Sequence, residues 1–551
     1  MNSDSSSASG VLYGLDDRPP LAKAVVLAAQ HVLTMFGSTI AVPLIFGPLL
    51  WPVLEELPES VRVELTELQL INTALLISSV MLCSGVATLL QSTFGSRLPI
   101  IQGVSFSFLA AFSVIIAKTQ SNAVLDWSAV VAGDVSEQTL LPLVEQWQQT
   151  GSSGMRTIAG AVLIGGILEA VIGFAGLMGL VRRVLSPVVI GPVIMLIGLA
   201  LYNVGAPVAA SNWAVSICMM VLIVLFALIL SRWFRWFQLF PMLSAIVVVV
   251  TLCWWLGREE VILFGNPAFV DLSAFDRADW FRVTDVFFPW GFPEWSLSAL
   301  VAVIAGYLAS MIESFGDYHA CKNMAGAGDP TPREISRGIA WEGIGCGLTG
   351  VFGGFSSTSY SENIGLIGLT KVASRYVIQI GGVILICLGL FGKFGALASA
   401  IPKPVVGGLY CTLFGLIAAV GVRQFAKADL SSDRNLFIGG FALFMGLSLP
   451  AWFNSPEGAE AMLAMHAAVL ERLVDWFGPL TSSGGDWRET FTDSLTESFA
   501  AIGKTGMAVA AILGITLDNL VPGTREERGL PEKPGILVPE AGDIERGPRG
   551  A

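Results

Sequence analysis

Charge is scarce in this sequence. Only 13% of the 551 residues are Asp, Glu, Lys or Arg, and 54% are hydrophobic. Soluble domains average about 25% charged residues. We therefore interpret the chain as one membrane-embedded unit with short polar tails rather than as a set of soluble domains. The net charge of −12 argues against nucleic acid as a partner.

The sequence also lacks the motifs of common enzyme classes. It contains no HExxH, GxxxxGK[ST] or GxSxG pattern, and no CxxC pair occurs among its seven cysteines. An ATP-driven pump, an embedded hydrolase, a disulfide framework and a zinc site are therefore not expected. The sequence predicts no enzyme, no cofactor and no metal. The N-terminus is polar and lacks the pattern of a cleaved signal peptide, so it is predicted to be a cytoplasmic tail.

Apolar segments near 20 residues long fill most of the chain, and they predict an all-α polytopic membrane protein with about 14 spans. Basic residues such as Arg97, Arg232 and Lys371 fall in alternate loops, which the positive-inside rule assigns to the cytoplasm. Acidic loops such as Glu55–Glu67 fall outside. Both termini are then cytoplasmic, in a plasma-membrane protein. The outer segment Glu457–Phe477 predicts either an amphipathic helix on the membrane surface or a solvated cap.

The third and tenth apolar segments are interrupted. They read "LPIIQGVSFSFLAAF" and "GGFSSTSYSENIGLIGL", with Ser and Gly before each helix. Non-helical backbone at membrane depth is tolerated where it is buried in protein or lines a cavity, and paired interruptions point to a transporter's central site. Helix N-termini leave backbone N–H groups free. The expected donors are the amides near Ser105 and Phe106 and those near Ser361 and Glu362.

Several acids lie inside apolar segments. Glu313 and Asp317 are four residues apart and share a helix face, and Glu342 lies in "IAWEGIGCG". An intramembrane carboxylate is a functional hypothesis, the alternative being a pair with a nearby polar side chain. Glu313 is the candidate for holding a coupling proton, because loss of water disfavours the charged form. Glu362 is compensated by its helix N-terminus. His31, also mid-span, is either a core histidine or a switch or ligand.

Four stretches together resemble the nucleobase–ascorbate transporter family, also called nucleobase:cation symporter-2. These stretches are "QHVLTMFGSTIAVPLIFG", "QGVSFSF", "SMIESFGDYHA" and "SENIGLIGLTKVASR". The likeness covers the chain from about Tyr13 to Pro522. The family motif of the tenth span matches Glu362, Asn363, Gly365, Thr370 and Lys371.

The resemblance implies an architecture of about 14 spans in two inverted seven-span repeats, with half-helices in spans 3 and 10. A transmembrane unit, residues 21–522, would lie between tails 1–20 and 523–551. Its core would comprise spans 1–4 and 8–11, about 21–180 and 296–398. Its gate would comprise spans 5–7 and 12–14, about 184–258 and 404–521. The core would move against the gate like an elevator, and the protein would be a homodimer.

The resemblance also implies site residues. In bacterial uracil permeases the acids matching Glu313 and Glu362 bind the base, and the positions of Phe106, Tyr360 and Ser361 complete the site. In fungal uric acid–xanthine permeases the positions that matter match Glu313, Asp317, Glu342, Asn363 and Ser105. Asp317, Glu342 and His31 join Glu313 as candidates for proton coupling or site support.

Specificity is suggested by two positions. Ascorbate transporters have Pro where Glu362 stands, xanthine and uric acid permeases usually Gln, and uracil permeases Glu. Uracil permeases tend to have His at the position of Asp317, and an Asp there is more similar to the purine permeases of the family. The leading hypothesis is a proton-coupled uracil importer. The alternatives are a purine or broad nucleobase symporter, sodium coupling, an anion transporter of the related fold, and a receptor-like protein that binds a base without moving it.

Overall fold

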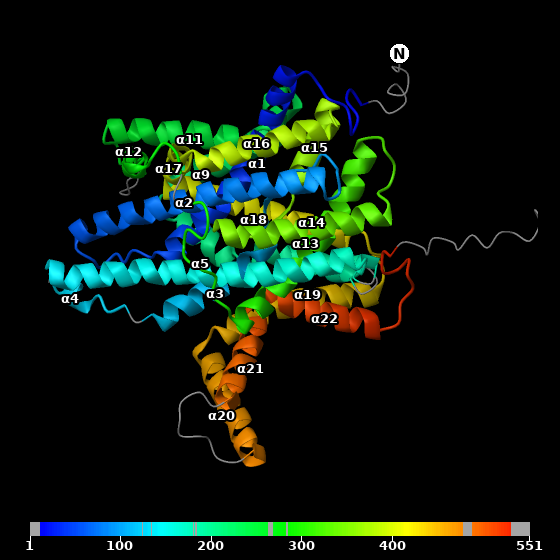
Figure 1. Ribbon diagram of the computed structural model, residues 1–551. Helices are drawn as coiled ribbons and strands as arrows, with labels where there is room; N and C mark the ends of the chain where they lie inside the picture. Colours follow the sequence, from blue (N-terminus) through cyan, green and yellow to red (C-terminus); the bar gives the residue numbers. More distant parts are fainter. Residues whose placement is uncertain are drawn as a thin grey trace, which may run out of the picture.

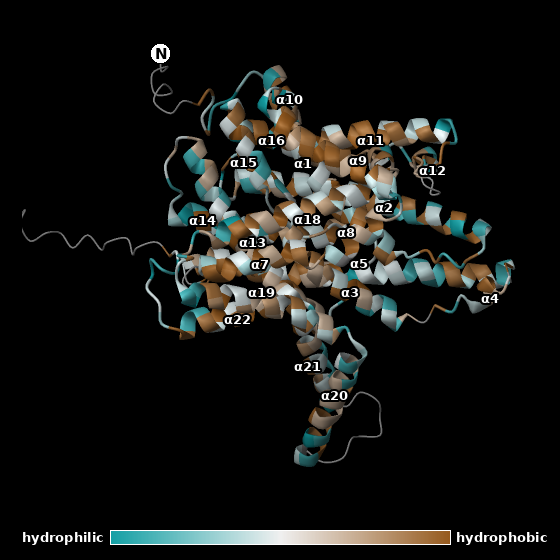
Figure 2. Cartoon of the chain, turned by 180° about the vertical axis from the view of Figure 1, so that it is seen from behind, coloured by the Kyte–Doolittle hydropathy of each residue, from teal (hydrophilic) through white to brown (hydrophobic). Residues whose placement is uncertain are grey.

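Helices make up nearly all of the regular structure. The computed structural model describes residues 11–123, 125–133, 135–179, 181, 185–262, 268–282, 285–477 and 487–530. Its longest helices lie side by side (Figure 1), and hydrophobic residues dominate their middle parts (Figure 2). Nine of the described helices are long and apolar enough to cross a membrane, or ten if the bent α21–α22 pair is one span. The chain is thus an all-helical polytopic membrane protein, as predicted.

The helices pack in two groups. The first helix group comprises α1 (Leu21–Leu50), α2 (Glu59–Thr93), α3 (Leu109–Asn122), α5 (Glu137–Phe174), α13 (Leu297–Met324), α14 (Pro332–Phe352), α16 (Arg375–Leu390) and α17 (Gly392–Ser399). The second helix group comprises α7 (Pro187–Leu199), α8 (Tyr202–Ala209), α9 (Trp213–Val224), α11 (Pro241–Arg258), α18 (Lys403–Phe425), α19 (Asp433–Phe453) and α22 (Gly506–Leu520). Short helical segments lie in the connections between successive helices: α4 (Ser128–Val131), a π-helical turn (Leu225–Ile229), a 3-10 turn (Leu230–Arg232), α10 (Arg235–Leu239) and α12 (Ser273–Arg277).

Glycines bring α5 and α14 into backbone contact. A Cβ atom added to Gly343 would lie 2.4 Å from the Ala170 nitrogen and 2.6 Å from the Gly166 oxygen. A Cβ atom on Gly173 would lie 2.3 Å from the Ala340 nitrogen. Small residues allow this close approach between helices in an apolar environment. The two helices therefore form one rigid pair in the first helix group.

The ends of α14 are set by local chemistry. The Thr331 hydroxyl accepts a hydrogen bond from the Glu334 amide, and the Glu334 carboxylate accepts one from the Thr331 amide. This capping box satisfies amides that the helix leaves free. At the other end Gly353 adopts a left-handed conformation, with φ of 72°, which favours glycine. The chain then leaves the helix and enters an extended segment.

Two short strands pair at the centre of the molecule. β1 (Gln102–Val104) and β2 (Ser357–Ser359) are antiparallel, with Gln102 opposite Ser359, and all their residues are buried. The Tyr360 ring lies so close to Gly103 that an added Cβ atom would meet it at 2.5 Å. The extended segments predicted in the third and tenth apolar segments are therefore confirmed.

A short helix follows each strand. A 3-10 turn (Phe106–Phe108) and α3 follow β1, and α15 (Ser361–Thr370) follows β2. With 14 and 10 residues, α3 and α15 are about 21 and 15 Å long, less than the roughly 30 Å of a bilayer's hydrocarbon core. This is one reason why fewer complete helical spans are present than the sequence predicts.

The last predicted span is wrong in one respect. Phe499–Leu520 is not a single helix, because the chain bends by 89° between Lys504 and Gly506. Its first residues belong to α21 (Trp487–Lys504), which packs against α20 (Pro456–Phe477) in a hairpin that projects from the bundle (Figure 1). Residues 457–477 are thus helical, while the two alternatives for this segment, a helix on the membrane surface or a solvated cap, both stay predictions.

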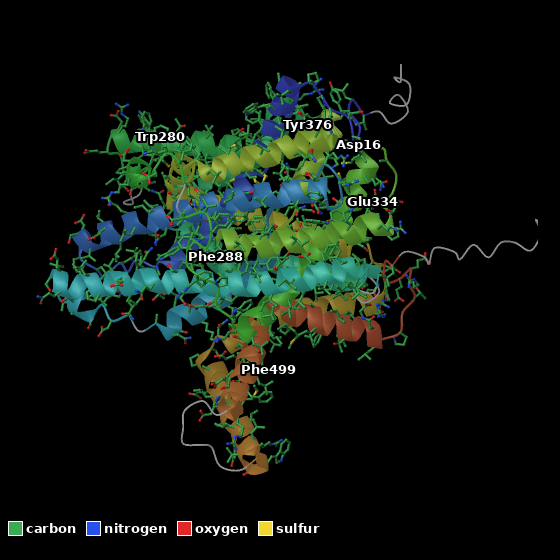
Figure 3. All side chains as sticks on the ribbon, viewed as in Figure 1. Asp16, Trp280, Phe288, Glu334, Tyr376 and Phe499 are labelled. Carbon is green, nitrogen blue, oxygen red and sulfur yellow. The ribbon has the colours of Figure 1, made fainter. Side chains whose placement is uncertain are left out.

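The described part of the N-terminal tail is packed against the bundle. The Leu12 amide donates to the Lys371 carbonyl at 2.6 Å, and the Ala373 amide donates to the Tyr13 carbonyl at 2.8 Å. Residues 1–10 and 531–551 of the predicted tails lie outside the described residues. Asp16, Glu334 and Tyr376 lie at one end of the bundle, and Trp280 lies at the opposite end (Figure 3).

The glycine contact between α5 and α14 predicts a stability effect. We expect Gly343→Ala to lower the free energy of unfolding by about 1–3 kcal/mol, the usual cost of overpacking. Gly440→Ala on α19 is the matched control, because no atom lies within 4 Å of a Cβ atom there. Thermal unfolding of both variants in detergent measures the difference. Equal melting temperatures for Gly343→Ala and the parent protein would contradict the described contact.

Candidate functional site

An accessible group of acids lies where α15 begins. Ser361 donates a hydrogen bond to Asp317 Oδ1 at 2.7 Å, which ties the start of α15 to α13. Glu313 lies one turn earlier on α13, and its charge interacts with those of Asp317 and Glu362. As whole residues Ser361 and Glu362 are exposed and Glu313 is half-buried, although the carboxyl groups of both acids are closely surrounded by protein atoms. The structure therefore brings together four of the predicted site residues, and we call them the acidic site.

The acidic site has room and unused hydrogen-bonding capacity. A Cβ atom added to Gly316 or Gly365 would meet no atom within 4 Å, so open space lies beside both helices. Asp317 is only 7% exposed, and its Oδ2 has no hydrogen-bond partner among the described residues. Buried polar atoms are normally hydrogen bonded. The N–H group of a ligand is a chemically suitable partner for this oxygen.

Glu342 is held by hydroxyl groups. Its Oε1 accepts hydrogen bonds from Ser314 at 2.6 Å, Thr358 at 3.1 Å and Ser310 at 3.3 Å. Its Oε2 accepts one from Tyr318 at 2.8 Å. Glu342 is 2% exposed. These bonds link α14 to α13 and β2, so the observed geometry gives Glu342 a supporting position behind the acidic site.

This Glu342 network was not predicted from the sequence. Besides Ser310, Ser314 and Thr358 it includes Tyr318, whose hydroxyl accepts a hydrogen bond from Gln91 Nε2. One signal was present: Ser310, Ser314 and Tyr318 recur every four residues and so share one face of α13. Hydroxyl groups are common in helices, however, and their shared partner lies on another helix.

The strand–helix junction after β1 differs in part from the prediction. The Ser105 amide donates to the Ser356 carbonyl at 2.9 Å, and the Ser105 side chain accepts from the Ser107 amide. The Ser105 amide is therefore not available to a ligand in this conformation, because the sheet has already paired it. Phe106 begins the following turn and is half-buried. The first amides of a helix have no acceptor within it, so the Phe106 amide remains the candidate donor.

Tyr360 and Asn363 lie on the buried side of the junction. The Tyr360 hydroxyl donates to the Val104 carbonyl at 3.1 Å and lies 3.3 Å from Thr39 Oγ1. Asn363 Nδ2 donates to the His31 carbonyl at 2.9 Å and lies 3.2 Å from His31 Nδ1. His31 thus contacts Asn363 rather than the acids. In this conformation these side chains fix β1, α15 and α1 to one another.

A second opening lies toward the other end of α3 and α13. It is a cavity of about 1470 Å³ lined by parts of α3, α5 and α13 on one side and of α19 and α21 on the other. The ion pair between Lys118 and Glu497, 2.6 Å long, crosses it from α3 to α21. Glu313, Asp317 and Glu362 are not among its lining residues. Ala302, which lines it, is 11 residues from Glu313, or about 16 Å along the helix.

The described residues contain no group of three or more His, Cys, Asp or Glu side chains that could hold a metal ion. The acidic site itself offers carboxylate oxygens as hydrogen-bond acceptors and the amides at the start of α15 as donors. Such groups recognise a polar ligand.

Known proteins resemble the chain over nearly its whole length. A sequence profile described as "Permease family" (Xan_ur_permease) matches residues 22–455. "Solute carrier family 23 member 1" of Rattus norvegicus is 35% identical over 547 residues, covering 94% of this chain and 82% of that protein. "Nucleobase-ascorbate transporter 2" of Arabidopsis thaliana is 32% identical, covering 95% of this chain and 91% of that protein.

Among solved structures, the transmembrane domain of a cyanobacterium bicarbonate transporter BicA gives a TM-score of 0.47 at 12% identity. It covers 78% of this chain and 96% of that chain. This likeness is too distant to carry an argument about the fold or the transported solute.

The polytopic fold and these matches define the class of the protein, which is a multi-pass membrane transporter and not an enzyme. The chain belongs to the xanthine/uracil permease family, the nucleobase:cation symporter-2 group that includes the nucleobase–ascorbate transporters. The family resemblance drawn from the four sequence stretches is therefore confirmed.

The Glu342 network predicts that Tyr318→Phe destabilises the protein. The substitution removes a donor from Glu342 Oε2 and the acceptor of Gln91 Nε2, and buried unpaired groups cost about 1–3 kcal/mol each. Tyr202→Phe is the control, because Tyr202 is 71% exposed. Thermal unfolding should show a lower melting temperature for Tyr318→Phe alone. A drop of the same size in both variants would argue against the network.

Proposed function

We propose that the protein imports a nucleobase, with uracil as the leading substrate, by proton symport. The observation that carries the proposal is the acidic site, where accessible carboxylates lie beside the first amides of a short helix. Family membership supports a nucleobase, because one relative is named a nucleobase–ascorbate transporter.

The acidic site is chemically complementary to uracil. A planar ring with alternating N–H and C=O groups needs both acceptors and donors along its edge. Glu313, Glu362 and the free Asp317 Oδ2 are acceptors for ring N–H groups. The backbone amides at Phe106 and at the start of α15 are donors for ring carbonyls, strengthened by the helix dipoles. Tyr360, Asn363 and Glu342 would then support binding without touching the base, because they fix the two strand–helix junctions.

A broader or purine specificity is the second candidate. Its specific support is Asp317, which lies in the acidic site and matches the purine branch of the family. The name of the Arabidopsis relative also includes ascorbate, but several neighbouring carboxylates repel an anion. The same repulsion disfavours a bicarbonate-like anion. Sodium in place of the proton remains the alternative for coupling, because carboxylates serve either ion.

We further propose that the first helix group is the core and the second helix group is the gate. Much of their contact is apolar: Ala305 and Ala309 on α13 pack near Ile194 and Met507. An apolar contact has few directional hydrogen bonds to break, so it favours sliding of the first helix group along the second. A polar contact between the two groups is the hydrogen bond from the Tyr410 hydroxyl on α18 to the Ala41 carbonyl on α1, and the Lys118–Glu497 ion pair joins α3 to α21, the helix before α22. A count of about 14 spans with both termini cytoplasmic would place the 1470 Å³ cavity outside.

In this arrangement the acidic site faces the cytoplasm. Glu362 is exposed, and the acids are separated from the outer cavity. Import would require the core to move so that Glu313 and Glu362 open toward that cavity, an elevator-like step. As in the family, we expect the transporter to be a plasma-membrane homodimer.

Transport itself is tested by uptake of labelled uracil into proteoliposomes under an inward proton gradient, with unlabelled bases and ascorbate as competitors. We expect uptake that falls when the gradient is collapsed and that uracil inhibits most strongly. If xanthine or uric acid inhibits uptake more strongly than uracil, the proposed substrate becomes a purine. If a sodium gradient drives uptake and a proton gradient does not, the coupling ion is sodium rather than the proton. No uptake of any base in active liposomes would overturn the proposed function.

The role of Glu362 generates a sharper prediction. Glu362→Gln should weaken uracil uptake about tenfold or more, because an amide is a weaker acceptor than a carboxylate and a charge-assisted hydrogen bond is lost. Xanthine uptake should be unchanged or improved. Glu64→Gln is the control, because Glu64 is exposed on α2 outside the acidic site. An equal loss of uracil and xanthine uptake would show that Glu362 is not the selectivity determinant.

A further inference from the structure

One buried acid has no part in the acidic site. Glu169 lies in the apolar stretch "GGILEAVIGF" of α5, is 1% exposed, and neither of its carboxyl oxygens has a hydrogen-bond partner among the described residues. A charge without a partner is very unfavourable away from water, so such a group takes up a proton instead. Glu169 therefore differs from every other acid considered above.

The neighbours of Glu169 are already engaged. It interacts electrostatically with Glu342 and Cys346 on α14 and with Tyr307 and Tyr318 on α13. The Cys346 thiol donates to the Ser357 carbonyl at 2.9 Å, and the Tyr307 hydroxyl donates to the Val162 carbonyl at 2.7 Å. The Tyr318 hydroxyl donates to Glu342. None of these four groups is a cation, and the Cys346 thiol, which is near enough to turn toward Glu169, is only a weak donor.

Glu342 is the opposite case. Four hydroxyl groups donate to its two oxygens, and hydrogen bonds to a carboxylate stabilise the charged form. The backbone contact of α5 and α14 at Gly166 and Gly343 leaves no layer of side chains between these helices near the two acids. When two neighbouring acids have such different surroundings, one holds the proton and the other the negative charge. Here the proton is on Glu169 and the charge is on Glu342.

We propose that Glu169 is a second proton-binding site, which holds one proton beside a charged Glu342. The proton can move from the Glu169 carboxyl to Glu342 once the neighbouring Cys346 thiol turns from the Ser357 carbonyl and donates to Glu169. The negative charge then moves from Glu342 to Glu169, where it has a donor, so charge and atoms balance. A protonated Glu342 accepts hydrogen bonds less strongly from Ser314 and Thr358. Thr358 lies on β2, directly before the start of α15, so the exchange loosens the support of the acidic site. This role in transport rests on the proposed function, whereas the proton site itself does not.

Infrared difference spectroscopy tests the proton site directly. A protonated carboxyl group has a C=O stretch distinct from that of a carboxylate and shifted in heavy water. At neutral pH, the purified Glu169→Gln variant should lose one such band relative to the parent protein, and Glu64→Gln should lose none. An unchanged protonated-carboxyl region in folded Glu169→Gln would overturn the inference. If Glu169→Gln does not fold, Glu169→Asp should shift the band, and a band at an unchanged frequency would overturn it equally.

The link to transport needs a second readout. In Glu169→Gln, the ratio of uptake in mildly acidic to mildly alkaline medium should fall toward one while substrate affinity is retained. A parallel loss of uptake at every pH would reduce Glu169 to a structural residue and overturn its coupling role. A different outcome is that Glu169→Gln loses the infrared band but the parent protein shows no proton-driven uptake. Glu169 would then still be a proton-binding site, and the proposed proton coupling of transport would be refuted.

Discussion

The four hydroxyl groups around Glu342 hold the centre of this structure together. They come from α13 and β2, while the carboxylate comes from α14. Burying a carboxylate is unfavourable unless its hydrogen bonds are satisfied, so the network favours one relative position of these elements. The positions of β1, which pairs with β2, and of α15, which follows it, depend on that arrangement.

This constraint explains how the acidic site can have acids beside open space while the backbone next to it stays buried. The backbones of β1 and β2 hydrogen bond to each other and to side chains such as Thr88 and Ser314, so they are satisfied away from water. The start of α15 is then free to present Ser361 and Glu362 to an opening, while Asn363 on the same helix binds the His31 carbonyl. Exposed polar groups and a buried structural contact thus come from adjacent residues of one short helix.

Much of this arrangement could be predicted from the sequence, because hydropathy and local composition are local properties. The Ser and Gly residues before Phe106 and Ser361 predicted the extended segments, and acids in apolar runs predicted Glu313 and Glu342. The donors to Glu342 could not be predicted, because Thr358 and Ser314 meet it only after three elements pack. The bend after Lys504 was missed because hydropathy continues across it. Glu169 has the same local signal as Glu342, an acid inside an apolar run, and only the packed structure shows that Glu342 has donors and that Glu169 has none among the described residues.

The ordered start of the chain has a practical consequence for spectroscopy. Residues 12 and 13 hydrogen bond to the backbone just after α15, so they must travel with that helix whenever it moves. Leu12 is 58% exposed, so a label there can be attached without disturbing the core. A fluorophore or spin label attached there, paired with one on the second helix group, would test the proposed movement of the two groups without a probe among the residues of the acidic site.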